Sequence, residues 1–237
     1  MGPMGQSCTL VVRAPGSTDT REVTLPYGAM DGVMPSDARP KEIVKELERG
    51  IWYFDLTRGQ DKDFNAALAN LATAKGIVFD MRGYPRVSTA WFSNVTKTPM
   101  RSAQWHVPVV DRPGQMIFER SGEWNLTPKE PYLGAKKVFL THGGAISYAE
   151  STMGIVENYK LGEIVGEATA GTNGNVNPFE LPGGYTLTWT GMKVLKHDGS
   201  QHHGVGIAPT IPAARTQAGV AAGRDAVLER GVAELKK

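Results

Sequence analysis

The sequence predicts an α/β fold built on a largely parallel sheet, and two kinds of pattern lead to this expectation. Continuous apolar runs, typical of buried strands, occur at residues 51–56, 76–80 and 137–141. Amphipathic helical patterns follow two of these runs, at residues 61–74 and 147–161. Strands that alternate with helices imply a layered α/β domain in which the sheet is mostly parallel.

The N-terminal part precedes this alternation. Residues 8–13 and 21–25 are predicted as two short strands joined by a turn. Residues 26–40 are rich in Gly, Pro and Asp and are predicted as a linker. A short charged helix is expected over Lys41–Leu47, ended by Gly50.

The remaining elements follow the same reasoning. The helix at residues 61–74 carries Phe64, Leu68 and Leu71 on one face, and Asp61 stands near its start. Further along, the patterns predict an inserted hairpin or flap at 100–124, a short strand at 164–165, a Gly/Asn-rich loop at 170–178, a strand pair with a Gly183-Gly184 turn within 181–196, and a closing helix at 225–235.

Composition excludes several classes of function. The 237 residues carry a net charge of +2 with scattered basic residues, which argues against a nucleic-acid partner. The apolar runs are too short to span a membrane. The only cysteine, Cys8, allows neither an intrachain disulfide nor a cysteine-based metal site, and no cofactor is expected. No signal peptide is visible, but a strand pattern begins almost at once, so we expect a chain cut from a longer one.

The most informative motif surrounds Ser147. The apolar strand Val138–Thr141 leads through the turn residues Gly143 and Gly144 to this serine, which then opens a helix. A hydroxyl and free backbone N–H groups at a helix N-terminus suit a serine nucleophile with an oxyanion site. Alternatively, Ser147 is only an N-cap, and Glu150 completes a capping box with it.

A second motif is Asp80-Met81-Arg82-Gly83, at the end of a predicted buried strand. Ligands of open α/β sheets bind at the carboxyl ends of strands, and Gly83 would let a substrate approach the backbone closely. The alternative is a surface turn with an Asp80–Arg82 ion pair.

Two further stretches are loops. Residues 165–177 can line a cleft or form an ordinary loop. Residues 198–209 include the adjacent histidines His202 and His203. Neighbouring side chains of an extended chain point to opposite faces, and no zinc-site spacing accompanies them, so no metal site is predicted.

Taken in order, these motifs resemble the tail-specific (carboxyl-terminal processing) serine protease family. The matching segments are Asp80–Gly83, Ile146–Glu150, Gly166–Gly171 and His203–Pro209. The resemblance covers residues 50–237, the expected catalytic domain. Residues 1–27 resemble the end of a PDZ domain, which leaves residues 28–49 as the linker and short helix.

The resemblance implies a crotonase-like ββα protease core with a short PDZ-like remnant. Ser147 would attack a peptide carbonyl, and the N–H groups of Gly83 and Tyr148 would form the oxyanion hole. The substrate would be a peptide or protein cut near its C-terminus, bound by the loop that contains Gly171, Thr172, Asn173 and Asn177. Relatives of this kind suggest a periplasmic or secreted protein; the oligomeric state stays open.

The sequence departs from the family at the general base. Thr172 and Asn173 stand where many members carry the catalytic lysine, and Asp55 replaces the histidine of the tricorn-like branch. The remaining candidates are His142, His106, His202, His203, Lys196 and Glu150. Three hypotheses follow: a serine peptidase with an unusual base, a catalytically impaired peptide-binding protein, or an acyl-transfer or hydratase-like enzyme on the same fold.

Overall fold

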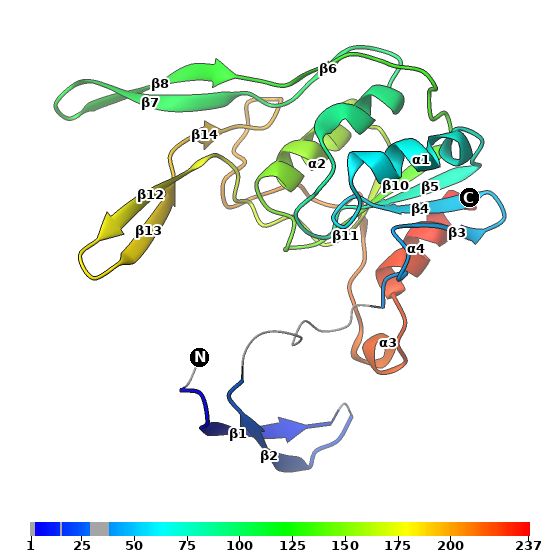
Figure 1. Cartoon of the computed structure of the whole chain (residues 1–237), viewed down its shortest axis with the longest axis vertical. Helices are drawn as coiled ribbons and strands as arrows, with labels where there is room; N and C mark the ends of the chain where they lie inside the picture. Colours follow the sequence, from blue (N-terminus) through cyan, green and yellow to red (C-terminus); the bar gives the residue numbers. More distant parts are fainter. Residues whose placement is uncertain (1–2, 15, 29–37) are drawn as a thin grey trace. The chain divides into compact units, whose positions relative to one another are not determined.

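The computed structural model of the chain describes residues 3–14, 16–28 and 38–237. These residues form two compact units, one of residues 1–39 with 215–226 and one of residues 40–214 with 227–237. Figure 1 gives the arrangement of elements within each unit. Most of the predicted linker, residues 29–37, lies outside the described residues.

The smaller unit contains a two-stranded antiparallel sheet and a short helix. Strands β1 (Ser7–Arg13) and β2 (Thr20–Pro26) pair in register from Ser7 opposite Pro26 to Arg13 opposite Thr20. Both predicted strands are confirmed. Helix α3 (Gln217–Ala221) begins at Thr216, whose side chain accepts a hydrogen bond from the Gly219 N–H.

The larger unit is organised around a six-stranded sheet in the order β15-β11-β10-β5-β4-β3. All neighbours are parallel except β3 and β4, which are antiparallel. This mixed sheet confirms the predicted α/β class. Its strands are β3 (Val44–Glu48), β4 (Ile51–Asp55), β5 (Gly76–Asp80), β10 (Lys136–Thr141), β11 (Glu163–Gly166) and β15 (Ile211–Pro212).

Helices cover both faces of this sheet (Figure 1). On one face α1 (Asp61–Ala72) and α2 (Tyr148–Tyr159) pack with the 3₁₀ helix η1 (Thr89–Asn94) around a core that contains Phe79 and Phe139. On the other face α4 (Ala226–Leu235) covers Val78, Val138 and Leu140. Because side chains alternate along a strand, β5 and β10 contribute to both cores and are buried on both sides.

The predicted helix over residues 41–47 is wrong. Residues 44–48 form β3, which pairs with β4 from Val44 opposite Phe54 to Glu48 opposite Ile51. Edge pairing with an already buried strand outweighs the helical preference of this charged segment. As a strand it places Val44 against the core under α1 and Leu47 against the core under α4.

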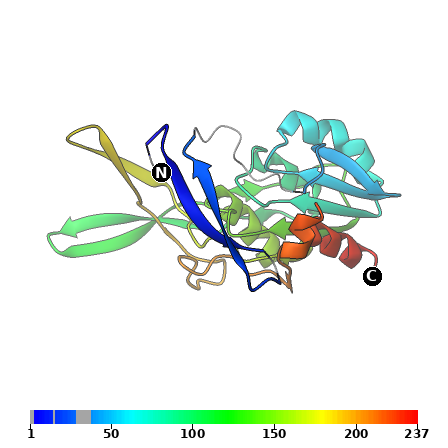
Figure 2. The same ribbon diagram turned by 90° about the horizontal axis from the view of Figure 1, so that it is seen from below.

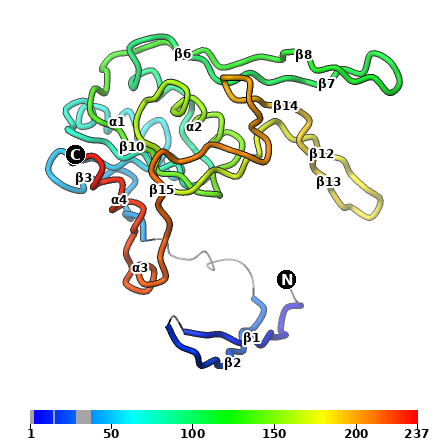
Figure 3. Tube along the Cα trace, turned by 180° about the vertical axis from the view of Figure 1, so that it is seen from behind, coloured from blue at the N-terminus to red at the C-terminus, as the bar shows by residue number. Residues whose placement is uncertain are grey.

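Two long hairpins project beyond the α/β layers of the larger unit (Figures 2 and 3). Strands β7 (Trp105–Arg112) and β8 (Gln115–Gly122) form the predicted inserted hairpin, and β14 (Lys193–Val194) adds to β7. Strands β12 (Val176–Leu181) and β13 (Tyr185–Thr190) form the second, around the predicted glycine turn, so β12 starts within the predicted loop. Strands β6 (Met100–Arg101) and β9 (Asn125–Leu126) flank the first hairpin in the sequence and pair with each other.

No helix among the described residues is long and apolar enough to cross a bilayer.

Candidate active site

Ser147 stands at the turn between β10 and α2, immediately before the first residue of the helix, as predicted. Its backbone has φ 52° and ψ −109°, a combination that non-glycine residues seldom adopt. Such strain persists only where the surroundings hold it, and it gathers at functional sites. Here the Ser147 N–H is held by two acceptors, the Thr172 carbonyl at 2.8 Å and the Glu150 carboxylate at 3.2 Å.

Glu150 ties together the segments that surround Ser147. The predicted capping box with Ser147 is formed, and the Glu150 side chain is only 1% exposed. Its carboxylate also accepts hydrogen bonds from the Thr169 hydroxyl at 2.7 Å, the Gly171 N–H at 2.6 Å and the Thr172 N–H at 2.7 Å. One buried carboxylate therefore fixes both the start of α2 and the loop after β11.

His202 contacts the same carboxylate, with its Nε2 atom 3.3 Å from Glu150 Oε1. Burial raises the pKa of Glu150, but the close His202 imidazole and hydrogen bonds from Thr169 and the Gly171 N–H outweigh it, so this pKa lies below its usual value. Glu150 is thus held as a carboxylate and is a poor proton acceptor.

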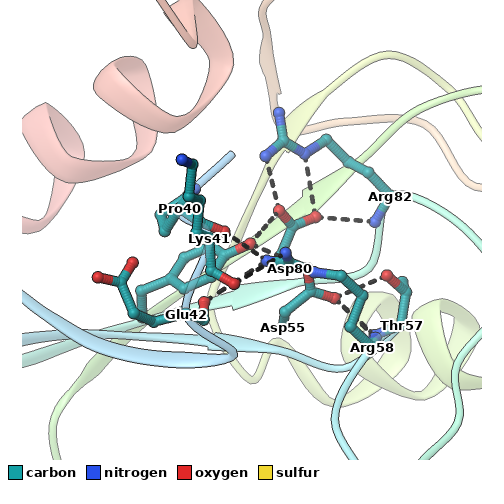
Figure 4. Close-up of polar contacts among 9 residues, drawn as sticks. Pro40, Lys41, Glu42, Asp55, Thr57, Arg58, Asp80 and Arg82 are labelled. Carbon is teal, nitrogen blue, oxygen red and sulfur yellow. Dashed lines mark hydrogen bonds and ion pairs between the residues drawn. The ribbon is translucent and has the colours of Figure 1, made fainter. Parts of the chain in front are cut away.

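The second motif lies at the carboxyl end of β5. The Asp80 carboxylate is fully buried and accepts from Arg82 Nη2 at 2.6 Å, Arg82 Nε at 3.0 Å and the Arg82 N–H at 3.0 Å (Figure 4). Tyr53 donates its hydroxyl to Asp80 at 2.8 Å. The Asp80–Arg82 ion pair expected from the sequence is present, but it is buried and fixes the turn that leads to Gly83.

Asp55, at the end of the neighbouring strand β4, belongs to the same network. It accepts from Arg58 Nε at 2.6 Å, the Thr57 hydroxyl at 2.6 Å and the Tyr53 hydroxyl at 3.1 Å. Arg58 reaches on to the Pro40 carbonyl at 2.6 Å (Figure 4). Asp55 therefore acts as a structural carboxylate at the place where the tricorn-like branch has a histidine.

The turns after β5 and β10 meet, as the parallel pairing of these strands requires. The rings of Tyr84 and Tyr148 lie 5.9 Å apart, and the Tyr148 hydroxyl donates to the Val87 carbonyl at 2.9 Å. Burial, with a smaller effect of the Asp61 charge, raises the pKa of Tyr148 to about 12, so this hydroxyl stays protonated. Gly83 and Ser147 are each one residue away from this aromatic contact.

The two proposed oxyanion donors differ in their hydrogen bonding. Gly83 has φ 141°, and its N–H donates to the Met81 carbonyl at 2.9 Å, closing a tight turn. The Tyr148 N–H, at the first position of α2, has no hydrogen-bond partner within the described residues. A free N–H at a helix start is suited to negative charge.

The predicted substrate-binding residues fall into different environments. Gly171 and Thr172 lie beside Ser147 through the contacts of Glu150 described above. Asn173 is 7% exposed, and its amide donates to the Ser151 hydroxyl at 3.0 Å, one turn along α2. Asn177 lies on the exposed strand β12, opposite Trp189.

The comparisons with known proteins agree with this arrangement. The profile of peptidase family S41 matches residues 50–213. The chain belongs to peptidase family S41. The match covers all four sequence motifs. The comparison with curated protein sequences finds no match.

Solved structures share the fold of this S41 chain at low sequence identity. A putative peptidase from Parabacteroides merdae has a TM-score of 0.67 at 18% identity, over 82% of this chain and 64% of its own. Mature CPAF in complex with lactacystin has 0.69 at 13%, over 99% and 67%. The photosystem II D1 C-terminal processing protease has 0.52 at 18%, over 90% and 57%. The S41 chain therefore spans about two thirds or less of the length of these structures.

No candidate base forms a hydrogen bond with the Ser147 hydroxyl within the part of the chain that the structure describes. Glu150, one of the candidates, contacts Ser147 through the Ser147 backbone N–H. Lys196 forms an ion pair with Glu157, with 3.0 Å between Nζ and Oε1. His142 lies on the turn before Ser147, and its Nδ1 accepts from the Gly144 N–H at 2.8 Å. A neutral imidazole has one acceptor nitrogen, so that of His142 is already in use.

Two other histidines form no hydrogen bond with Ser147 among the described residues. His106 is on β7, where its buried Nδ1 has no hydrogen-bond partner among the described residues, and His203 is exposed. Among all the residues that the structure describes, no group of three or more His, Cys, Asp or Glu could hold a metal ion. A local motif singles out Ser147 as a candidate, but no local motif could indicate the further contacts of Glu150, because they come from Thr169, Gly171, Thr172 and His202.

Proposed function

We propose that this chain is the catalytic part of a serine endopeptidase in which Ser147 attacks the peptide carbonyl. The observation that carries the proposal is the strained backbone of Ser147 at the start of α2, held by the Thr172 carbonyl and by Glu150. A serine held in this way presents its hydroxyl beside a free N–H. Membership of peptidase family S41 supports the same chemistry.

The oxyanion formed on attack would be bound by the N–H groups of Tyr148 and Gly83. The Tyr148 N–H is available, whereas the Gly83 N–H must first leave the Met81 carbonyl. Glycine at this position makes that rotation inexpensive, because it has no Cβ to restrict φ. Substrate binding would therefore complete the oxyanion hole.

The substrate would be an extended peptide cut near its C-terminus, in a crotonase-like core. Gly171 and Thr172 would offer backbone groups to it, and Asn177 would contact the peptide further out. Asn173 would act indirectly, by fixing this loop to Ser151. The strands β1 and β2 would belong to a PDZ-like domain, and the protein would act in the periplasm or outside the cell.

A fluorophosphonate probe tests the nucleophile, because it forms a covalent bond to activated serines. We expect labelling of the wild type and none of Ser147→Ala. The matched control is Ser121→Ala, an exposed serine on β8, which should still be labelled. Peptide binding without any labelling would instead support the catalytically impaired alternative.

The position of cleavage needs a separate experiment. A peptide with a free C-terminal carboxylate is compared with the same peptide amidated and with one extended by ten residues. Cleavage at a fixed distance from each C-terminus supports tail specificity. Cleavage at one internal sequence in all three peptides would leave the peptidase in place but remove its tail specificity.

A further inference from the structure

The hairpin β12–β13 has two chemically different faces. Directly paired residues of an antiparallel ladder share a face, and successive pairs alternate. One face carries the pairs Asn177–Trp189, Phe179–Leu187 and Leu181–Tyr185. The opposite face carries Val176–Thr190, Pro178–Thr188 and Glu180–Thr186. Five large apolar side chains thus gather on one face, the apolar face of the hairpin.

This apolar face is open to solvent. Phe179 is 52% exposed, Leu181 42%, Tyr185 73%, Leu187 53% and Trp189 47%. The hairpin projects beyond the α/β layers, and its two strands pair with no third strand within the described residues (Figures 1 and 3). An isolated two-stranded hairpin is only marginally stable in water, so this face needs a cover.

The size of the apolar face fits association of two protein surfaces. Aromatic side chains bury about 150–250 Å² each, so five half-exposed large residues present on the order of 500 Å². Two such faces stacked together would remove roughly 1,000 Å² from solvent, which is the lower limit for a specific interface. A contiguous exposed apolar patch of a few hundred Å² is often functional in a soluble protein, unlike apolar residues scattered singly.

The charge of the hairpin argues for protein rather than lipid. Residues 175–191 contain no Lys or Arg, and their one charged residue is Glu180, on the polar face. Surfaces that bind membranes carry cationic residues to attract anionic lipids. An uncharged apolar face instead suits a second uncharged face, and a two-fold axis supplies one without any new sequence.

We propose that the apolar face of β12–β13 docks on the same face of a second copy of this chain. The two hairpins stack as facing sheets, with their side chains interleaved as in a sheet-on-sheet core. Phe179 and Leu187, the middle pair of the three, lie nearest the two-fold axis. The interface uses the five apolar side chains and not Asn177, which is left for the substrate on the same face, and it uses none of the residues that contact Ser147.

Sedimentation velocity over a range of protein concentrations tests the proposal. We expect a reversible dimer for the wild type. Leu187→Lys places a charge in the centre of the interface and should weaken association by about tenfold or more. Its matched control is Thr188→Lys, the adjacent residue on the polar face, which should dimerise like the wild type.

Circular dichroism of both variants checks that the fold is kept, since neither side chain belongs to a buried core. A wild type that stays monomeric up to about 100 μM, well above typical specific affinities, overturns the proposal even if it binds lipid vesicles. Equal association of Leu187→Lys and Thr188→Lys also overturns it, because the dimer would then use another surface.

Discussion

Among single residues, Glu150 has the greatest influence on the geometry around Ser147. Its carboxylate accepts hydrogen bonds from the Ser147, Gly171 and Thr172 N–H groups and from Thr169. A buried carboxylate with this many donors restricts three segments at once. The motif Ser-x-x-Glu indicates the capping contact alone; the other contacts depend on how distant loops pack.

Glu150→Gln should destabilise the fold by about 2–4 kcal/mol near neutral pH, because an amide N–H then faces backbone donors in a buried site. The pKa of Glu150 is lowered in the folded chain. Its stabilising effect is therefore complete above the unfolded pKa of about 4.3 and is lost as the pH falls through the lower folded value. Urea unfolding between about pH 3 and pH 7 should show the gap between wild type and variant narrowing in acid. A gap that stays constant would contradict this.

Two glycines with the same backbone angle give a test of loop packing. Gly171 has φ 72° and Gly204 has φ 73°. A Cβ on Gly171 would lie 2.9 Å from the Val205 nitrogen, whereas a Cβ on Gly204 meets nothing within 4 Å. Gly204→Ala should cost only the backbone strain of about 1 kcal/mol, and Gly171→Ala at least about 2 kcal/mol more. Urea unfolding of both variants measures the difference; equal losses would show that the loops relax freely.

At the level of elements, the predicted strands and helices with continuous local patterns are the ones confirmed. The run Gly76–Asp80 is a strand buried on both faces, and the helix after Ser147 has nearly the predicted bounds. Residues 41–47 have a helical pattern as well, yet they form an edge strand. The free backbone edge of β4 decides their structure, and that edge cannot be recognised before the sheet is known.

Strand β5 tests how well a buried central strand tolerates a charge. Val78 is fully buried between β4, β10 and α4, so Val78→Asp places an unpaired carboxylate in the core. We expect the variant not to fold, because this penalty approaches the whole stability of a domain, about 5–15 kcal/mol. The matched control is Val176→Asp. Because Val176 is exposed on β12, this variant should melt like the wild type. A cooperative thermal transition of Val78→Asp would contradict the assignment of its burial.

Across the whole molecule, the candidate site is assembled from segments far apart in the sequence. The order of the motifs could indicate that the ends of β5 and β10 and the loop after β11 belong together. It could not indicate that the Gly83 N–H donates to Met81 or that Asn173 is buried against Ser151. These contacts depend on backbone rotation and on the packing of loops, which leave no periodic pattern in the sequence.

The candidate histidines for the general base come from separate parts of the chain. They are His106, His142, His197, His202 and His203. Glu150 is held ionised and Lys196 is paired with Glu157, so we expect a histidine to accept the Ser147 proton. Only a neutral imidazole can do so; its ordinary pKa is about 6.5, and the rate should therefore rise with pH through about 6–7. General-base catalysis contributes about 100-fold or more, and removal of the base should cost that much.

The measurement is the rate of probe labelling or peptide cleavage from about pH 5 to pH 9 in the wild type and in five single His→Gln variants. One variant should lose the rate together with the rise near neutral pH, and the other four should keep both. His142→Gln is the most informative, because release of the Gly144 N–H would free Nδ1 of His142 on the turn that leads to Ser147. If all five variants keep the rate and the profile of the wild type, the proton acceptor is not a histidine. The base would then have to come from outside the residues that surround Ser147 here.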